Sequence, residues 1–268
     1  MRKMKSKLFV VALLMLGSFL PLVLNETAQA PSEQTAEIPL LDTSSFVSTA
    51  SDGYIYQEDR THQGARDAAS GDFSYGTDLQ LIVGQKIAPT NNYLVYRTFL
   101  YFDTSSLPDD ATIASATLSL YLAYTLNTAT WDIVVQNGQP TYPHDPLVLA
   151  DFNQTYYNGD GGRIAALDIV AGYNDITLNE NAQNNWIRKD NITKLALRSS
   201  KDIDNQPPSS GEREIRFHSY ERSSGYPPTL TVLLTPPPPP SSGLPWIIVI
   251  TLLVTAMVAA IVLYLWRR

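Results

Sequence analysis

The sequence contains no cysteine and only three histidines among its 268 residues. Without cysteine, the chain can form neither a disulfide framework nor a cysteine-based zinc site. Three scattered histidines leave little capacity for metal ligation or general-base catalysis. The sequence also lacks a nucleophile elbow, a phosphate-binding loop, an HExxH motif and a dinucleotide fingerprint. The most recognisable classes of enzyme are therefore not indicated.

Basic residues are scarce in the central part of the chain. Between Pro31 and Gly243 there are 25 acidic and 13 basic residues, a net charge of −12. An acidic surface of this kind repels nucleic acids and other polyanions. We therefore expect no nucleic-acid partner.

The N-terminus is hydrophobic and resembles a targeting segment. A basic start is followed by an apolar run over residues 8–24, and Ala28-Gln29-Ala30 has the small-x-small pattern of a cleavage site. These features predict a signal peptide over residues 1–30, and the breaks at Gly17 and Pro21 favour it. Pro31 directly after the pattern is unfavourable for cleavage, so an uncleaved anchor is the alternative.

The C-terminus predicts a membrane anchor. Trp246 to Trp266 is a run of 21 residues without a charge. At about 1.5 Å per residue it is long enough to cross a hydrocarbon core of ~30 Å. Aromatic residues stand near both ends of the run, and two arginines follow. The sequence predicts a transmembrane helix over 244–266 in the lipid bilayer of the cell membrane, a cytoplasmic tail at 267–268 and an extracellular domain before the helix.

Residues 44–235 are long enough to bury one substantial core. A polar leader over 31–43 precedes them, and a proline-rich stalk over 236–243 follows. Short runs of β-branched and aromatic residues, separated by turn residues, predict an all-β, jelly-roll-like β-sandwich. The expected strands are 46–47, 54–56, 79–83, 93–103, 116–122, 131–135, 147–149, 164–169, 176–178, 194–199, 214–219 and 229–234.

Only one helix is expected inside this domain. It covers residues 180–187 and is capped by Asn179. Polar segments over 57–77 and 200–211 are expected as loops. Trp131 and Trp186 are expected in the core.

The stretch from Arg97 to Tyr121 carries a resemblance to a known family. An arginine, an apolar run ending in Phe102-Asp103, a turn at Ser106-Leu107-Pro108 and the strand Ser115–Tyr121 follow one another. This order resembles the hallmark of DNRLRE-type β-sandwich repeats, which include disaggregatase-related repeats and family 96 carbohydrate-binding modules. Segments 214–221 and 228–232 are similar to the last strands of that family, so the resemblance spans about 45–235. It implies a sandwich fold and binding of polysaccharide or cell-envelope glycan.

Exposed aromatic side chains on a sandwich can stack on sugar rings while polar neighbours meet the hydroxyl groups. The best candidates for a glycan site in the sequence lie on one turn-rich excursion. They are Tyr142, Tyr156, Tyr157 and Asn158. Ordinary packing of the loop is the alternative.

The resemblance to jelly-roll modules also implies structural calcium held by oxygen ligands from loops. The oxygen-rich candidates are Asp160, Asp202 and Asp204, with Asp52 and Glu221, near the first and last strands, as a second choice. None of these segments matches an EF-hand loop, and solvated turn carboxylates are the alternative. Asn153 and Asn191 stand in glycosylation sequons.

Three functions remain open at this point. The first is a membrane-anchored module that binds polysaccharide without catalysis. The second is a structural or adhesive surface protein that contacts other proteins or itself. The third is a polysaccharide hydrolase, which would need two carboxylates facing each other across a cleft.

Overall fold

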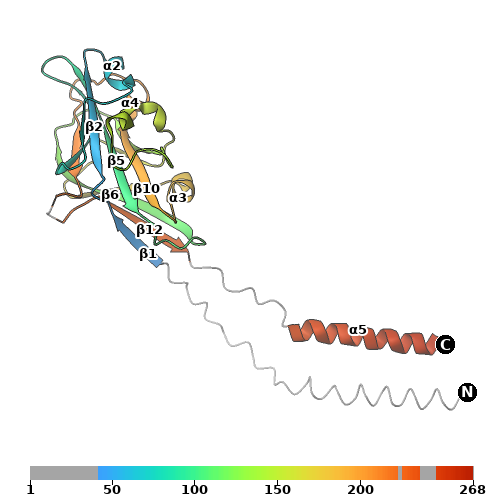
Figure 1. The fold of residues 1–268 in the computed structure, drawn as a ribbon. Helices are drawn as coiled ribbons and strands as arrows, with labels where there is room; N and C mark the ends of the chain where they lie inside the picture. Colours follow the sequence, from blue (N-terminus) through green and yellow to red (C-terminus); the bar gives the residue numbers. More distant parts are fainter. Residues whose placement is uncertain (1–41, 223–224, 236–245, 268) are drawn as a thin grey trace, which may run out of the picture. The chain divides into compact units, whose positions relative to one another are not determined.

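The structure is a computed structural model that describes residues 42–222, 225–235 and 246–267 (Figure 1). The predicted signal peptide, most of the polar leader and the proline-rich stalk lie outside these residues. The strands are β1 (Asp42–Val47), β2 (Gly53–Asp59), β3 (Phe73–Tyr75), β4 (Gln80–Ile87), β5 (Tyr93–Asp103), β6 (Thr112–Thr125), β7 (Asp132–Gln136), β8 (Arg163–Ala165), β9 (Tyr173–Thr177), β10 (Ile192–Ser199), β11 (Ile215–His218) and β12 (Thr229–Thr235). The helices are α2 (His62–Asp67), α3 (Glu180–Asn185), α4 (Ser200–Ile203) and α5 (Trp246–Arg267), with 3-10 turns η1 (Leu149–Phe152) and η2 (Gln154–Tyr156).

The strands form one continuous, curled sheet in the described part of the chain. Its main path is β1-β12-β6-β11-β4-β5-β10-β7-β8, and β2, β3 and β9 branch from it. Each of the described pairings is antiparallel. The prediction of an all-β, sandwich-like fold is confirmed.

The two longest strands, β5 and β6, cause the sheet to curl. β5 pairs with β2, with β4 along residues 93–96 and with β10 along residues 98–103. β6 pairs with β12, β9 and β11 along different parts of its length. Because each long strand changes partners, opposite parts of the sheet face each other and enclose a core.

The core contains apolar side chains from most strands. Leu100 and Phe102 of β5 and Leu118 of β6 are fully buried in it. Burying one such side chain stabilises the fold by about 1.5–3 kcal/mol. Trp131 and Trp186 are 3% and 4% exposed, so their predicted place in the core is confirmed.

A second, smaller layer covers the other face of β5. Phe99 and Tyr101 of β5 pack there with Phe152 and Tyr157 from the excursion that precedes β8. β5 is therefore buried on both faces, which explains why its sequence is almost continuously apolar or aromatic.

Several local predictions were wrong. The expected loop over 57–77 contains α2 and β3, and the expected loop over 200–211 begins with α4. The expected strand at 147–149 is instead irregular backbone that enters η1 at Leu149, and the strand at 79–83 does not stop at Gly84 but continues to Ile87. The short helices depend on caps and tertiary contacts: the Thr61 hydroxyl accepts from the Gly64 N–H at 2.9 Å, and Arg66 donates to the Asp202 carbonyl at 2.5 Å. α2 and α4 accordingly lie at the same end of the sandwich (Figure 1).

The predicted helix near 180–187 is confirmed in a shorter form as α3. The side chain of its cap residue, Asn179, accepts a hydrogen bond from the Ala182 N–H at 3.0 Å.

At the C-terminus, α5 coincides with the segment predicted to cross a membrane. Over the described residues, however, no helix combines the length and the apolar character that crossing a membrane requires.

Candidate functional site

A group of aromatic side chains covers one face of β2, β3 and β5. We call it the tyrosine strip, and it consists of Tyr54, Tyr56, Phe73, Tyr75 and Tyr96. The rings of Tyr54 and Tyr75 stack with centroids 4.9 Å apart, and those of Tyr56 and Phe73 with centroids 5.3 Å apart. Tyr56 also meets Tyr96 at 5.4 Å. Tyr54 and Tyr96 are nearly buried, whereas Phe73 is 53% exposed, so the strip rises from a buried base to the surface.

The strand register explains why these rings gather. Tyr54 lies opposite Tyr75, and Tyr56 lies opposite both Phe73 and Tyr96. Directly opposite residues of antiparallel strands share a face, and residues two apart on one strand do so too. In the sequence, the aromatic residues alternate in Tyr54-Ile55-Tyr56 and in Phe73-Ser74-Tyr75, which places the rings of each segment on one face. The sequence did not indicate that these two segments pair with each other.

An open groove of about 410 Å³ lies between β4, β11 and the end of β6. Its lining includes Lys86, Tyr124, Arg213, Glu214 and Arg216. The Lys86 ammonium lies 5.4 Å from the centre of the Tyr96 ring, so Lys86 belongs to both surfaces. The tyrosine strip and the groove are therefore continuous.

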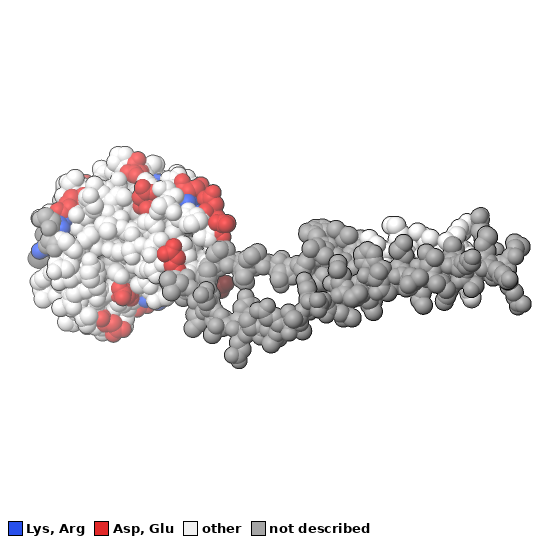
Figure 2. Space-filling model, turned by 90° about the horizontal axis from the view of Figure 1, so that it is seen from below, with Lys and Arg blue, Asp and Glu red and all other residues white. Residues whose placement is uncertain are grey.

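Ion pairs hold the polar groups of the groove. Glu214 Oε1 lies 2.8 Å from Lys86 Nζ and 2.8 Å from Arg216 Nη2. Burial alone would raise the pKa of Glu214, but Arg216 and Lys86 outweigh it and the pKa is lowered. The groove lining contains three basic side chains and this one carboxylate, although the domain as a whole is acidic. On the face shown in Figure 2, Asp and Glu cover more of the described surface than Lys and Arg do.

The predicted glycan cluster is only partly a surface. Tyr142 and Tyr156 stack with ring centroids 3.6 Å apart and are half-buried, so each covers one face of the other. Tyr157 was expected on the loop surface, but it is 5% exposed and packs 5.5 Å from Phe99. Asn158 is exposed and its backbone pairs with Asn137. The structure brings Tyr142 and Tyr156 together but removes Tyr157 from reach of a ligand.

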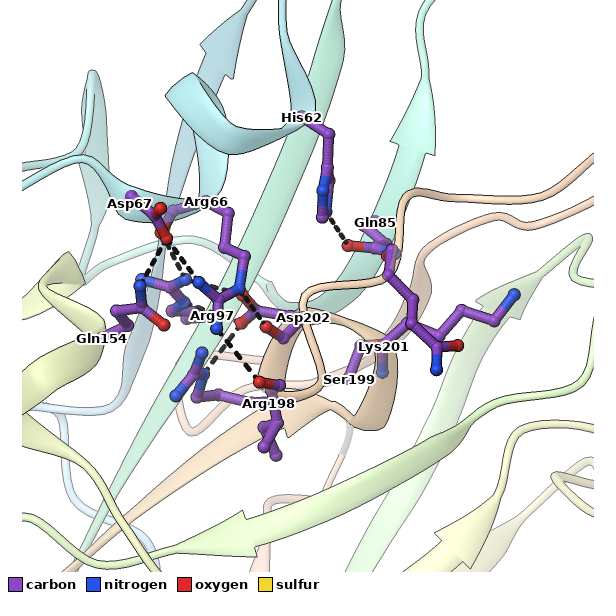
Figure 3. A network of polar contacts seen from close by, with 12 residues as sticks. His62, Arg66, Asp67, Gln85, Arg97, Gln154, Arg198, Ser199, Lys201 and Asp202 are labelled. Atoms are coloured by element: carbon purple, nitrogen blue, oxygen red, sulfur yellow. Dashed lines mark hydrogen bonds and ion pairs between the residues drawn. The ribbon is translucent and has the colours of Figure 1, made fainter.

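Asp202 was expected on a solvated, oxygen-rich loop, and the structure corrects this. It lies in α4, is 1% exposed, and both of its carboxylate oxygens are held by arginines (Figure 3). Arg97 donates to Oδ1 at 2.7 Å and to Oδ2 at 2.8 Å, and Arg198 donates to Oδ2 at 2.8 Å. Burial alone would raise the pKa of Asp202, but Arg198 and Arg97 outweigh it and hold the pKa well below its usual range. This carboxylate serves an ion-pair network rather than a cation.

The other candidates are dispersed. Asp160 forms an ion pair with Arg163, and Asp204 is exposed at the end of α4. The side-chain oxygen of Asn153 accepts from Thr155, and that of the exposed Asn191 accepts from the N–H of Ile192. In the part of the chain that the structure describes, no three His, Asp or Glu side chains gather into a group that could hold a metal ion.

Asp52 and Glu221 are the one pair of predicted ligands that the structure brings into contact. Asp52 is 1% exposed, and its carboxyl group meets that of Glu221. Burial, together with the nearby Glu221, raises the pKa of Asp52 to about 7, against the lowering effect of the Ser48 hydroxyl. The first and last parts of the domain therefore meet through two acids.

Comparisons with known proteins say little about this chain. The chain matches no protein-family model, and no curated relative matches it. Among solved structures it is similar to a chain in the cryo-EM structure of Mud crab tombus-like virus, at 12% identity and a TM-score of 0.25. That similarity covers 79% of this chain and 89% of the viral one, and a TM-score this low carries no argument.

Proposed function

We propose that the domain is a non-catalytic module that binds polysaccharide on the tyrosine strip and in the adjoining groove. The observation that supports it is the continuity of five aromatic side chains with a polar groove on one face of the sheet. Aromatic rings cover the apolar faces of sugars, and charged and hydroxyl groups bond the sugar hydroxyls. The family resemblance implies the same class of ligand, and the jelly-roll form of the sandwich belongs to this proposal.

The tyrosine hydroxyl groups of the strip are uncharged at neutral pH. Burial raises the pKa of Tyr54 and of Tyr96, so both hydroxyl groups stay protonated, and that of Tyr54 donates to Asp78 Oδ2 at 3.3 Å. Among the residues that line the groove, Glu214 is the single carboxylate, and it is held by two cations. Glycoside hydrolysis ordinarily uses two carboxylates, so the groove favours binding without cleavage.

The test is a glycan array with neutral and acidic polysaccharides, followed by affinity electrophoresis on the best ligand. We expect Phe73→Ala and Tyr75→Ala each to weaken binding about tenfold, which corresponds to ~1.4 kcal/mol. Tyr173→Ala is the matched control, because Tyr173 is 44% exposed on β9, away from the strip. Tyr156→Ala tests the loop pair predicted from the sequence.

Two results would argue against this proposal. One is the absence of binding to any glycan by a protein whose melting temperature shows that it is folded. The other is a pair of strip variants that lose self-association instead of glycan binding. That second result would favour the adhesive alternative, because β3 pairs only with β2 among the described strands and is an exposed edge.

The location of the domain is a separate proposal that depends on the sequence of the two ends. We propose that residues 1–30 direct export and that the uncharged run over 244–266 attaches the chain to a membrane, with the sandwich outside the cell. The described residues provide no membrane-crossing helix, so protease treatment of intact cells must decide it.

A further inference from the structure

Two buried arginines share one buried carboxylate beneath the smaller layer that covers β5. Arg97 and Arg198 both reach Asp202 (Figure 3), and the side chains of all three are at most 3% exposed. One carboxylate neutralises one guanidinium group, so the three side chains together carry a surplus positive charge. A buried charge without a counter-charge is strongly destabilising, and folded proteins pair almost all such groups.

The nearest other charged side chains have partners of their own. Arg66, at the edge of the group, forms an ion pair with Asp67. Asp151 is a fully buried carboxylate of the same layer, and its oxygens are held by backbone N–H groups and by the ring of His144. In the part of the chain that the structure describes, neither Asp67 nor Asp151 forms an ion pair with Arg198. The surplus charge therefore remains.

The contacts of Arg198 leave one of its nitrogens over. Its Nε donates to Asp202 at 2.8 Å, and its Nη1 donates to the side-chain oxygen of Gln136 at 2.9 Å. Gln136 in turn donates to the Gly159 carbonyl at 3.0 Å, which fixes the direction of this chain of contacts. Arg198 Nη2 is buried and has no acceptor among the described residues. The nitrogens of Arg97, by contrast, all donate to oxygens of the protein.

A second buried donor without an acceptor, the hydroxyl group of Tyr157, lies in the same layer. On β10, Ala196 lies opposite Gln136 of β7 and opposite Phe99 of β5. Arg198 is two residues further along β10 and therefore shares the face of Ala196. The Tyr157 ring packs on that face, with its centroid 5.5 Å from that of Phe99. Two unsatisfied donors from different segments thus lie over one small area of the sheet.

We propose that Arg198 Nη2 and the Tyr157 hydroxyl group bind a chloride ion. A water molecule would satisfy the two donors but leave the surplus charge in place, whereas an anion supplies an acceptor and a counter-charge together. Arg198 and Tyr157 are only 2% and 5% exposed, so a monatomic ion suits the site better than phosphate or sulfate does. A spherical ion also accepts hydrogen bonds from any direction, which suits donors that come from separate segments.

The ion would attach the excursion between β7 and β8 to the sheet. Arg198 belongs to β10, whereas Tyr157 belongs to the excursion, which also carries the stacked pair Tyr142 and Tyr156. Bound chloride therefore stabilises the smaller layer over β5. This role is separate from the glycan binding proposed for the tyrosine strip.

The experiment uses the full-length protein, purified in a mild detergent, while sodium gluconate is replaced stepwise by sodium chloride at constant ionic strength. Gluconate is too large for a buried site of this kind. We expect the melting temperature to rise and then level off, by roughly 5–10 °C at a hundredfold excess of chloride over its Kd. The chloride NMR line reports binding directly: it should broaden when the protein is added and sharpen again when bromide displaces the ion.

Arg198→Gln is expected to abolish both the rise in melting temperature and the line broadening. This change leaves Arg97 and Asp202 as a neutral pair, so the reason for binding an anion is removed. Tyr157→Phe removes a single hydroxyl group and is expected to weaken chloride binding about tenfold, as loss of a hydrogen bond to a charged group does. The matched controls are Arg60→Gln and Tyr226→Phe, both at exposed residues, and they should respond like the wild type.

A wild-type protein that shows neither a saturable rise in melting temperature nor line broadening would overturn the proposal. An Arg198→Gln protein with the full chloride response would overturn it as well, because the ion would then bind elsewhere. If Arg198→Gln does not fold, Tyr157→Phe decides, and an unchanged affinity for chloride would contradict the site with two donors. None of these results bears on glycan binding, which depends on different residues.

Discussion

Arg97 shows how one buried charge holds several segments together. Its side chain is 0% exposed, its guanidinium lies 4.0 Å from the centre of the Phe152 ring, and it donates to the carbonyl groups of Arg66 and Phe152. With Asp202 as its counter-ion, it connects β5, α2, η1 and α4. The outer layer over β5 therefore depends on a charge pair as well as on apolar contacts.

We expect Asp202→Asn to destabilise the domain by about 3–5 kcal/mol, because it leaves two buried guanidinium groups without a counter-charge. Urea denaturation measures this, and Asp103→Asn, at an exposed residue, is the control. The pH dependence has a definite sign. The pKa of Asp202 is lower in the folded than in the unfolded protein, so its contribution is present above about pH 4 and is lost as the pH falls further.

The Asn variant should therefore lose less stability than the wild type on acidification to pH 3. An equal loss in both proteins would show that other carboxylates govern acid unfolding.

Little of the network around Arg97 and Asp202 could be predicted from the sequence. Arg97 and Asp202 are 105 residues apart, and nothing local indicates that they pair. Trp131 and Trp186 were predicted in the core because size and apolar character suffice for that.

At the scale of the element, Gly84 decides the shape of β4. It has φ of +123°, and a Cβ atom there would lie 3.0 Å from the Trp131 ring and 3.2 Å from the Glu214 backbone. The strand can therefore turn at this point while it stays paired with β5 before the loop at 88–92. The sequence predicted a strand end at this glycine, because glycine commonly interrupts strands. The structure shows a continuous strand that changes its pairing partner at this glycine, from β11 to β5.

We expect Gly84→Ala to destabilise the fold by about 1–3 kcal/mol through backbone strain and the contact with Trp131. Gly76→Ala is the matched control, since no atom lies within 4 Å of its added Cβ and its φ is not positive. That change should be neutral or slightly stabilising. Both values come from chemical denaturation, and equal stability of the two variants would contradict the assigned role of Gly84.

At the scale of the whole molecule, the proposed export of the sandwich and its attachment to a membrane can be tested directly. We expect protease added to intact cells to digest residues 44–235 and to leave a cytosolic control protein whole. Digestion only after the cells are permeabilised would place the domain inside. Replacing Val254 and Val258 by lysine should release the chain from the membrane fraction, because a charge near the middle of an inserted helix costs about 2.5–3.5 kcal/mol.

The sequence by itself determined the class of fold and the positions of most strands, because alternation of apolar residues and turn residues act within a few positions. It also identified the hydrophobic ends and the acidic middle, which depend on composition alone. Only the tertiary structure decided which aromatic residues share a face, which carboxylate is neutralised by arginines and which remain unpaired. These features depend on strand pairings between residues as far apart as Asp42 and Leu234, at the two ends of the domain, and no local pattern encodes such pairings.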